Sequence, residues 1–264
     1  MTCDIFLPVQ NSFKLLQPPA ALPLSAPPPF ATPVGNCHNH LPFHTACATG
    51  NLKLCMLWLS CLPDLLSSRD EKYNTPLMLA VAHQQNTLAR HLIYSGAFAD
   101  AQNYDGDTAL HLAVQALNFE ALELLLKCGA NPNVANARGE TALHAAVAQG
   151  SYEAVKILLL SGCFVNSRDE QGETCLHWAT REETVHLMQL LLAAGVDVDA
   201  VNHCGETALH LSVYSATVDV AQILLEADAN VHIRNNNGAT PLLEAKENGF
   251  CQIVTLLEQW LTRE

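Results

Sequence analysis

Small and apolar side chains recur along this chain at a constant step of 33 residues, and the pattern predicts a pair of short helices in each step. Small residues allow the first helices of neighbouring units to approach closely, and leucines give the second helices an apolar face. A period of this size is typical of a solenoid, in which each unit buries its apolar face only against its neighbours. The small positions are Ala80, Ala113, Ala146, Ala179, Ser212 and Ala245, and the leucine positions are Leu92, Leu125, Leu158, Leu191, Leu224 and Leu257.

Polar residues and glycines keep the same phase and mark the ends of these helices. Each pair opens with a segment that begins with threonine. A glycine stands two residues before it, where a tight hairpin needs positive φ, and another glycine caps most of the second helices. The opening segments are Thr75-Pro76-Leu77-Met78, Thr108-Ala109-Leu110-His111, Thr141-Ala142-Leu143-His144, Thr174-Cys175-Leu176-His177, Thr207-Ala208-Leu209-His210 and Thr240-Pro241-Leu242-Leu243; the hairpin glycines are Gly106, Gly139, Gly172, Gly205 and Gly238.

These columns together resemble the ankyrin repeat, whose signature Thr-Pro-Leu-His opens a unit of a turn and two helices. The resemblance implies an all-α fold, a solenoid of stacked helix-turn-helix units joined by hairpin loops. We expect about seven repeats in a domain spanning residues 37–264. The first repeat, around Leu41-Pro42-Phe43-His44, and the last, from Thr240 onward, are predicted to be atypical caps.

Residues 1–36 differ in composition from the rest of the chain, because they hold eight of its 13 prolines. Proline removes a backbone donor and disfavours helices, so this segment is predicted to be a disordered, Pro-rich arm. The apolar residues between Cys3 and Leu16 leave open a short docking motif, beside the simpler interpretation of an unconstrained terminus.

Composition and charge restrict the location and the partners. Asp4 stands where a signal peptide would be basic, and no run of 18 apolar residues exists, so we expect a protein of the cytoplasm, the nucleus or both, without membrane contact. Thirteen basic residues face 26 acidic ones, for a formal charge of −13, which disfavours direct nucleic acid binding. The ten cysteines fall on repeat positions and show no paired spacing, so we expect reduced thiols. We also expect a monomer.

Candidate chemistry is sparse. Cys37, His40, His44 and Cys47 have a spacing that could bind zinc, but His44 also occupies the anchor position and Cys47 a buried helix position. The resemblance implies that the recurring anchor histidines bond backbone groups of the turn and of the next repeat. No catalytic triad, phosphate loop or paired-carboxylate signature is present, so we expect no enzyme, no cofactor and no metal.

Partner choice is expected where the repeats differ, since the invariant columns serve folding. By resemblance, these slots are the hairpin tips and the exposed side of the first helix of each repeat. The candidate protein-binding residues are Tyr104, Asp105, Asp107, Gln115, Arg138, Glu140, Gln149, Glu170, Gln171, Glu173, Arg181, Glu182, His203, Glu206 and Tyr214.

Four carboxylates in this set, Asp107, Glu140, Glu173 and Glu206, precede successive anchor threonines. One interpretation is an acidic row that attracts a basic peptide, such as a Lys/Arg-rich nuclear localisation signal. The other is that the carboxylates favour the following helix N-terminus and keep the protein soluble. The sequence does not choose between them.

Repeat number, charge and expected location are similar to those of the NF-κB inhibitors and their nuclear relatives, although no Asp-Ser-Gly element precedes the repeats. This resemblance implies a module that masks a segment of a transcription factor. The alternative is a substrate-recruiting adaptor for a ubiquitin ligase or another scaffold. A further expectation, also from the resemblance, is hydroxylation of Asn133 and Asn166. Both stand at the inter-repeat hairpin position where asparaginyl hydroxylase favours asparagine in ankyrin domains.

Overall fold

The computed structural model describes residues 41–262. The predicted Pro-rich arm of residues 1–36 lies outside them, as do Cys37 and His40 of the candidate zinc spacing. The domain boundaries therefore stay a prediction. Among the described residues, no helix combines the length and apolar character needed to cross a membrane.

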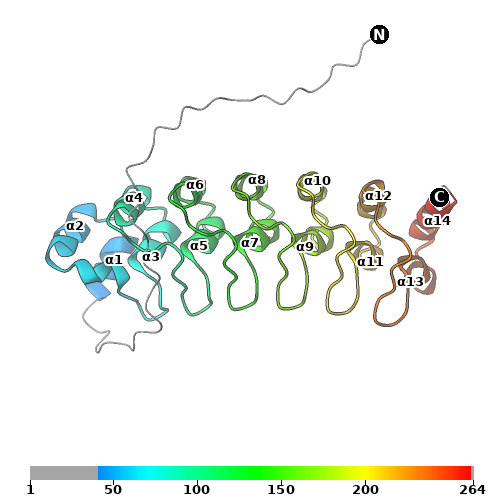
Figure 1. Ribbon diagram of the computed structural model, residues 1–264, viewed down its shortest axis with the longest axis horizontal. Coiled ribbons are helices and arrows are strands. Elements are labelled where there is room, and N and C mark those ends of the chain that lie inside the picture. The colour runs from blue at the N-terminus through cyan, green and yellow to red at the C-terminus, as the bar shows by residue number, and fades with distance from the viewer. Residues whose placement is uncertain (1–40, 263–264) are drawn as a thin grey trace, which may run out of the picture. The chain divides into compact units, whose positions relative to one another are not determined.

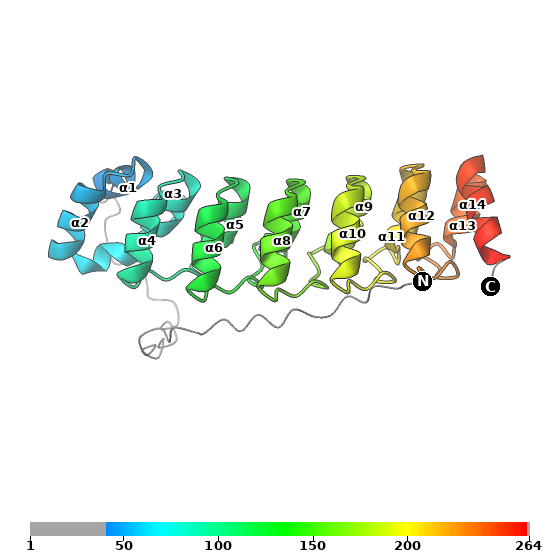
Figure 2. The same cartoon turned by 90° about the horizontal axis from the view of Figure 1, so that it is seen from above.

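Residues 41–262 form fourteen α-helices and a short 3-10 helix, with no strand, which confirms the predicted all-α fold (Figure 1). Odd-numbered helices form an inner row, even-numbered helices form an outer row, and the hairpin loops project beyond the inner row (Figures 1 and 2). The elements are α1 (Leu41–Ala48), α2 (Leu52–Cys61), η2 (Pro63–Ser67), α3 (Pro76–Ala82), α4 (Asn86–Tyr94), α5 (Ala109–Gln115), α6 (Phe119–Lys127), α7 (Ala142–Ala148), α8 (Tyr152–Leu160), α9 (Cys175–Arg181), α10 (Val185–Ala193), α11 (Ala208–Tyr214), α12 (Val218–Glu226), α13 (Pro241–Glu247) and α14 (Cys251–Leu261).

The two apolar columns read from the sequence lie in the core. Every member of the small column and every member of the leucine column is fully buried. Each inner helix contacts the inner helices on either side and the outer helix of its own repeat. The core is therefore one continuous layer between the two rows of helices, as nearest-neighbour stacking requires.

The anchor threonine and histidine start each inner helix and tie it to the next repeat. In the third repeat, the Thr108 N–H donates to His111 Nδ1 over 3.1 Å, and the Thr108 hydroxyl lies 2.9 Å from the same nitrogen. Because Nδ1 accepts the backbone N–H, the ring proton sits on Nε2, which donates to the Glu140 carbonyl over 3.1 Å. His144, His177 and His210 make equivalent contacts, so the structural role predicted for the anchor histidines is confirmed.

One buried position breaks the repeat rule in a way that costs stability. The inner helices carry a buried valine at Val81, Val114, Val147 and Val213, whereas α9 carries Thr180 there. The Thr180 side chain is fully buried, and its hydroxyl has no hydrogen-bond partner. A buried polar group without a partner is destabilising by about 1–3 kcal/mol.

We therefore expect Thr180→Val to stabilise the protein. Valine has nearly the same shape and occupies this position in four other repeats, so the gain should approach the cost of the unpaired hydroxyl, about 1–3 kcal/mol. Thermal unfolding followed by circular dichroism should show a higher Tm by about 2–4 °C per kcal/mol. Val147→Thr is the reciprocal control, and it should lower the Tm. A Tm that does not rise in Thr180→Val would mean that the hydroxyl is satisfied in solution.

Candidate protein-binding surface

The hairpin tips form a row held together by main-chain hydrogen bonds. Within one hairpin, the Asn136 N–H donates to the Glu140 carbonyl over 2.8 Å, and Asn136 Oδ1 accepts the N–H groups of Arg138 and Glu140 at 2.9 and 3.0 Å. Between hairpins, the Ala137 N–H donates to the Asp105 carbonyl over 2.9 Å, and the Glu170 N–H donates to the Arg138 carbonyl over 3.0 Å. The same bond joins each later hairpin to the one before it.

The close approach of the next hairpin requires the glycine at Gly106, Gly139 and Gly205, whereas a Cβ at Gly238, in the last hairpin, would meet no atom within 4 Å. Gly139 has φ +76°, and a Cβ there would lie 2.7 Å from the backbone nitrogen of Glu170 in the next hairpin. Any side chain would therefore separate the two hairpins as well as strain the backbone. The glycine column thus serves the row of tips, which sets the spacing of the side chains that the tips present.

Most of the predicted protein-binding residues are exposed. They fall into two groups, one on the hairpin tips and the other at the C-terminal ends of the inner helices. The tip residues that are exposed are Tyr104, Asp105, Arg138, Glu170, Gln171 and His203, and the helix-end residues that are exposed are Gln115, Gln149, Arg181, Glu182 and Tyr214.

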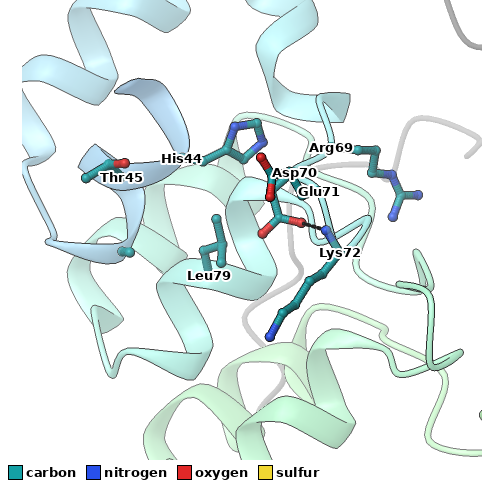
Figure 3. Close-up of a pocket in the computed structure, with 8 residues that line it drawn as sticks. His44, Thr45, Arg69, Asp70, Glu71, Lys72 and Leu79 are labelled. Carbon is teal, nitrogen blue, oxygen red and sulfur yellow. Dashed lines mark hydrogen bonds between the residues drawn. The ribbon is translucent and has the colours of Figure 1, made fainter. Parts of the chain in front are cut away.

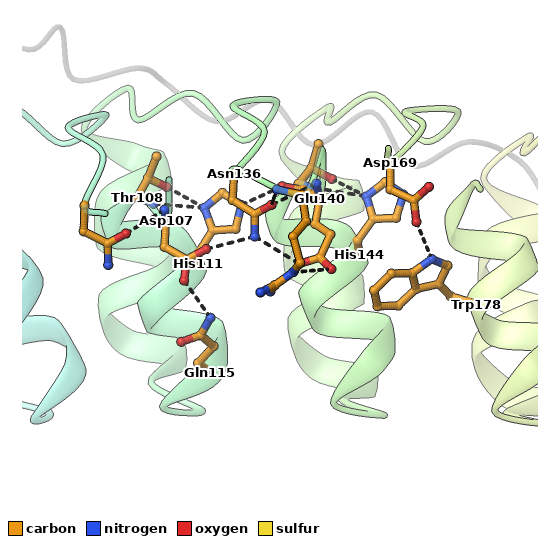
Figure 4. Close-up of polar contacts among 12 residues, drawn as sticks. Asp107, Thr108, His111, Gln115, Asn136, Glu140, His144, Asp169 and Trp178 are labelled. Atoms are coloured by element: carbon orange, nitrogen blue, oxygen red, sulfur yellow. Dashed lines mark hydrogen bonds and ion pairs between the residues drawn. The ribbon is translucent and has the colours of Figure 1, made fainter. Parts of the chain in front are cut away.

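The carboxylate column does not form an exposed acidic row. Asp107 and Glu173 are only 5% and 6% exposed, and Glu140 and Glu206 are half-buried. Asp107 accepts from the Asn136 side chain at 3.0 Å and from Gln115 at 3.1 Å (Figure 4). The interpretation of this column as an exposed acidic row therefore fails, because the column position points these side chains at donors of the same and the next repeat.

Two members of the column are neutralised by arginines of the chain itself. Arg138 donates from Nε and Nη2 to the Glu140 carboxylate at 2.8 and 2.7 Å, and these bonds hold the pKa of Glu140 below its ordinary value. Arg181 also makes a bidentate ion pair, donating from Nη1 to Glu173 Oε2 over 2.9 Å and from Nη2 to Glu173 Oε1. Reversing the charge of Glu140 or Glu173 would break these contacts, so the fold as well as any binding would suffer.

A cleft missed by the sequence analysis lies where the first, irregular repeats meet (Figure 3). It has a volume of about 280 Å³. Its lining includes basic and acidic side chains, among them Arg69, Asp70 and Lys72, together with the apolar side chain of Leu79. A second cleft of about 370 Å³ shares Asp70, Lys72 and Leu79 and extends toward Asp105. Together they provide a groove along the inner face of the first three repeats.

An exposed aromatic pair stands beside this groove. The rings of Tyr73 and Tyr104, on neighbouring tips, are in contact, with centroids 4.4 Å apart and planes tilted by 41°, and the two residues are 41% and 66% exposed. Tyr73 has φ +63° and occupies the slot that holds glycine in the later hairpins. A tyrosine in this conformation is strained, and such strain concentrates at functional sites. The mismatch with the glycine column was the sequence signal that could have revealed it.

The described residues contain no cluster of three or more His, Cys, Asp or Glu side chains arranged to hold a metal ion. Cys47 is fully buried, and its sulfur lies 3.7 Å from that of Cys55 in the core. His44 Nε2 lies 3.3 Å from the Ser68 hydroxyl. These two members of the candidate zinc spacing thus have other neighbours in the first repeat.

Asn133 and Asn166 occupy equivalent positions, as the hydroxylation hypothesis requires. Asn133 Oδ1 accepts the Phe164 N–H over 2.7 Å, and Asn166 Oδ1 accepts the Asp197 N–H over 2.8 Å. Each side chain therefore links its loop to the loop of the next repeat. Hydroxylation itself stays a prediction.

Comparison with known proteins agrees with this architecture. The sequence matches a family described as ankyrin repeats in three copies, over residues 43–136, 118–199 and 176–259. The chain therefore belongs to the ankyrin repeat family, whose domains are modules for protein–protein interaction. A search of curated proteins gives no match.

Two solved structures resemble the fold. The ankyrin repeat domain of Bcl-3, described as a unique member of the IkappaB protein family, matches with a TM-score of 0.77 and 28% identity, covering 83% of this chain and 99% of that one. An ankyrin repeat domain from Acinetobacter baumannii AYE matches with a TM-score of 0.65 and 32% identity, covering 70% of this chain and 97% of that one.

Proposed function

We propose that this protein binds and masks a segment of a partner protein through the surface made by its hairpin tips and inner-helix ends. The observation that carries the proposal is the contrast between an invariant, hydrogen-bonded scaffold and the varied side chains exposed on it. A fixed scaffold holds such residues in place before binding, which lowers the entropic cost of association. The protein acts as a monomeric, non-catalytic module of the cytoplasm or nucleus.

The proposed partner is a transcription factor of the NF-κB type, and the masked segment is basic. The similarity to the Bcl-3 domain supports the partner class. The formal charge of −13 supports the charge of the segment, because it attracts a cationic ligand at long range. Local selectivity is then provided by exposed acids, such as Glu170 on a tip and Glu182 after α9, rather than by the buried Asp107 and Glu173.

The test uses a fluorescent peptide that carries the Lys/Arg-rich localisation segment of an NF-κB-type transcription factor. The double variant Glu170→Lys/Glu182→Lys should bind it about tenfold more weakly or worse, measured by fluorescence anisotropy, since tenfold corresponds to about 1.4 kcal/mol. The matched control is Glu153→Lys/Glu226→Lys, which changes the net charge equally but on exposed positions of α8 and α12 in the outer row. Equal affinity of the two double variants would contradict the proposed surface.

A further inference from the structure

The sixth and seventh repeats place two carboxylates on one hydroxyl group. Tyr214, at the end of α11, has its Oη 3.0 Å from Glu206 Oε1 and 2.6 Å from Glu244 Oε1. A phenol carries a single proton, so it donates to only one of the two at a time. The other contact then brings together two oxygens that can only accept.

The other hydrogen-bond donors near Glu206 and Glu244 do not satisfy all the carboxylate oxygens. Asn202 donates to Glu206 Oε2 over 3.0 Å, and Asn235 donates to Glu244 Oε1 over 2.5 Å. Glu244 is only 6% exposed, and its Oε2 is buried without a hydrogen-bond partner. Because a buried carboxylate oxygen is costly to leave unpaired, this cluster lacks a donor.

The equivalent positions of the fourth and fifth repeats show what kind of donor is lacking. There, Arg138 and Arg181 pair with Glu140 and Glu173. Among residues 41–262, no lysine or arginine forms an ion pair with Glu206 or Glu244; the nearby Lys246 pairs with Glu258 over 2.8 Å. His210 already donates from Nε2 to the Ala239 carbonyl.

Glu244 is also foreign to its position in the repeat. The inner helices carry Leu79, Leu112, Ala145, Trp178 and Leu211 at this place. A buried glutamate here costs desolvation that an apolar side chain would avoid, so packing does not explain it. Tyr214 contacts both carboxylates through its hydroxyl and is itself 46% exposed.

We propose that the Glu206–Tyr214–Glu244 cluster is a subsite for an arginine side chain of the partner segment. The planar guanidinium offers several N–H donors, which can bond both carboxylates while the group stacks on the Tyr214 ring. A metal ion fits less well, because no cluster of three metal-binding side chains exists in the described part of the chain. This inference rests on the proposed function and places one contact of the masked segment at the C-terminal end of the surface.

The probe is a fluorescent peptide of alternating arginine and glycine, compared with the same peptide carrying citrulline, the neutral isostere of arginine, or lysine. The wild-type protein should bind the arginine peptide at low salt, lysine more weakly, and citrulline least. Glu244→Leu installs the residue found in three other repeats, so it should raise the Tm and yet weaken arginine binding about tenfold or more. A purely structural role would give the rise in Tm without the loss of binding.

Glu226→Gln, on the outer helix of the sixth repeat, removes one charge away from the cluster and should leave the arginine peptide affinity within about twofold. The inference is overturned if Glu244→Leu binds the arginine peptide as tightly as the wild-type protein, or if citrulline binds equally well. If the localisation-segment peptide then still depends on Glu170 and Glu182, the proposed function stands without this subsite. Loss of that dependence as well would overturn both.

Discussion

Acidification from about pH 7.5 to about pH 5.5 is expected to lower the free energy of unfolding steeply. The cause is the column of anchor histidines, His111, His144, His177 and His210, which are buried. Burial is the largest influence on each and lowers its pKa below the ordinary value of 6.5. Protonation at Nδ1 would also break the bond from the threonine N–H, since an imidazolium cannot accept.

The sign of the effect follows from where the proton binds. Above pH 6.5 both states carry neutral rings, and the stabilisation is fully present. As the pH falls below 6.5, the unfolded chain takes up protons first, and stability is lost until the pH reaches the lowered pKa of the folded state. Each histidine contributes up to about 1.4 kcal/mol per pH unit, so four give a limiting slope of about 5 kcal/mol per unit.

Urea unfolding at a series of pH values measures this slope. His177→Met should reduce it by about one quarter, because Met78 fills the same slot in the second repeat, where its sulfur accepts the Thr75 N–H over 3.3 Å. The control is His186→Gln, which changes an exposed histidine on α10 and keeps all four anchor histidines. An unchanged slope in His177→Met would show that the anchor histidines titrate alike in both states.

Leu158→Ala is expected to destabilise the protein by about 2–5 kcal/mol. Leu158 lies on α8 in the middle of the array and is fully buried between the two rows of helices. Truncation removes apolar contacts and leaves a cavity that rigid neighbours fill only in part. Because each repeat depends on its neighbours, the loss is felt on both sides of the fourth repeat.

Chemical denaturation provides the value, and the same helix supplies the control. Leu160 is 80% exposed, so Leu160→Ala should change the free energy of unfolding by about 0.5 kcal/mol at most. A cost of less than about 1 kcal/mol for Leu158→Ala would mean that the core collapses into the space. Peptide binding should weaken only under conditions where Leu158→Ala is partly unfolded.

The helices, the core and the histidine contacts could be predicted because each depends on one residue type that recurs at a fixed step. The surroundings of the carboxylate column could not be predicted in this way. The column is visible in the sequence, but whether Glu173 faces solvent or Arg181 depends on side-chain reach across the repeat. The acceptor-rich cluster at Glu244 was missed for a related reason, since only the structure brings Tyr214 against it from another helix.

The groove near the first repeat was missed because it breaks the register. Its lining combines His44 of α1, whose opening segment begins 34 residues before Thr75 instead of 33, with Arg69 to Lys72 of the hairpin that follows η2. Tyr73 in a glycine slot was visible as an exception. Its ring contact with Tyr104 could be seen only in the structure, which places adjacent tips side by side.

The bonds that join successive hairpins run from the N–H of one chain segment to the carbonyl of the next, for example from His203 to Gln171 over 2.9 Å. Such bonds use backbone atoms, so they form with any side chain at the donor position except proline, which has no N–H. Mutation can therefore change the side chains on the hairpin tips with little loss of stability, provided that the hairpin glycines are kept. Recognition in this protein can diverge quickly while the shape that presents it is conserved.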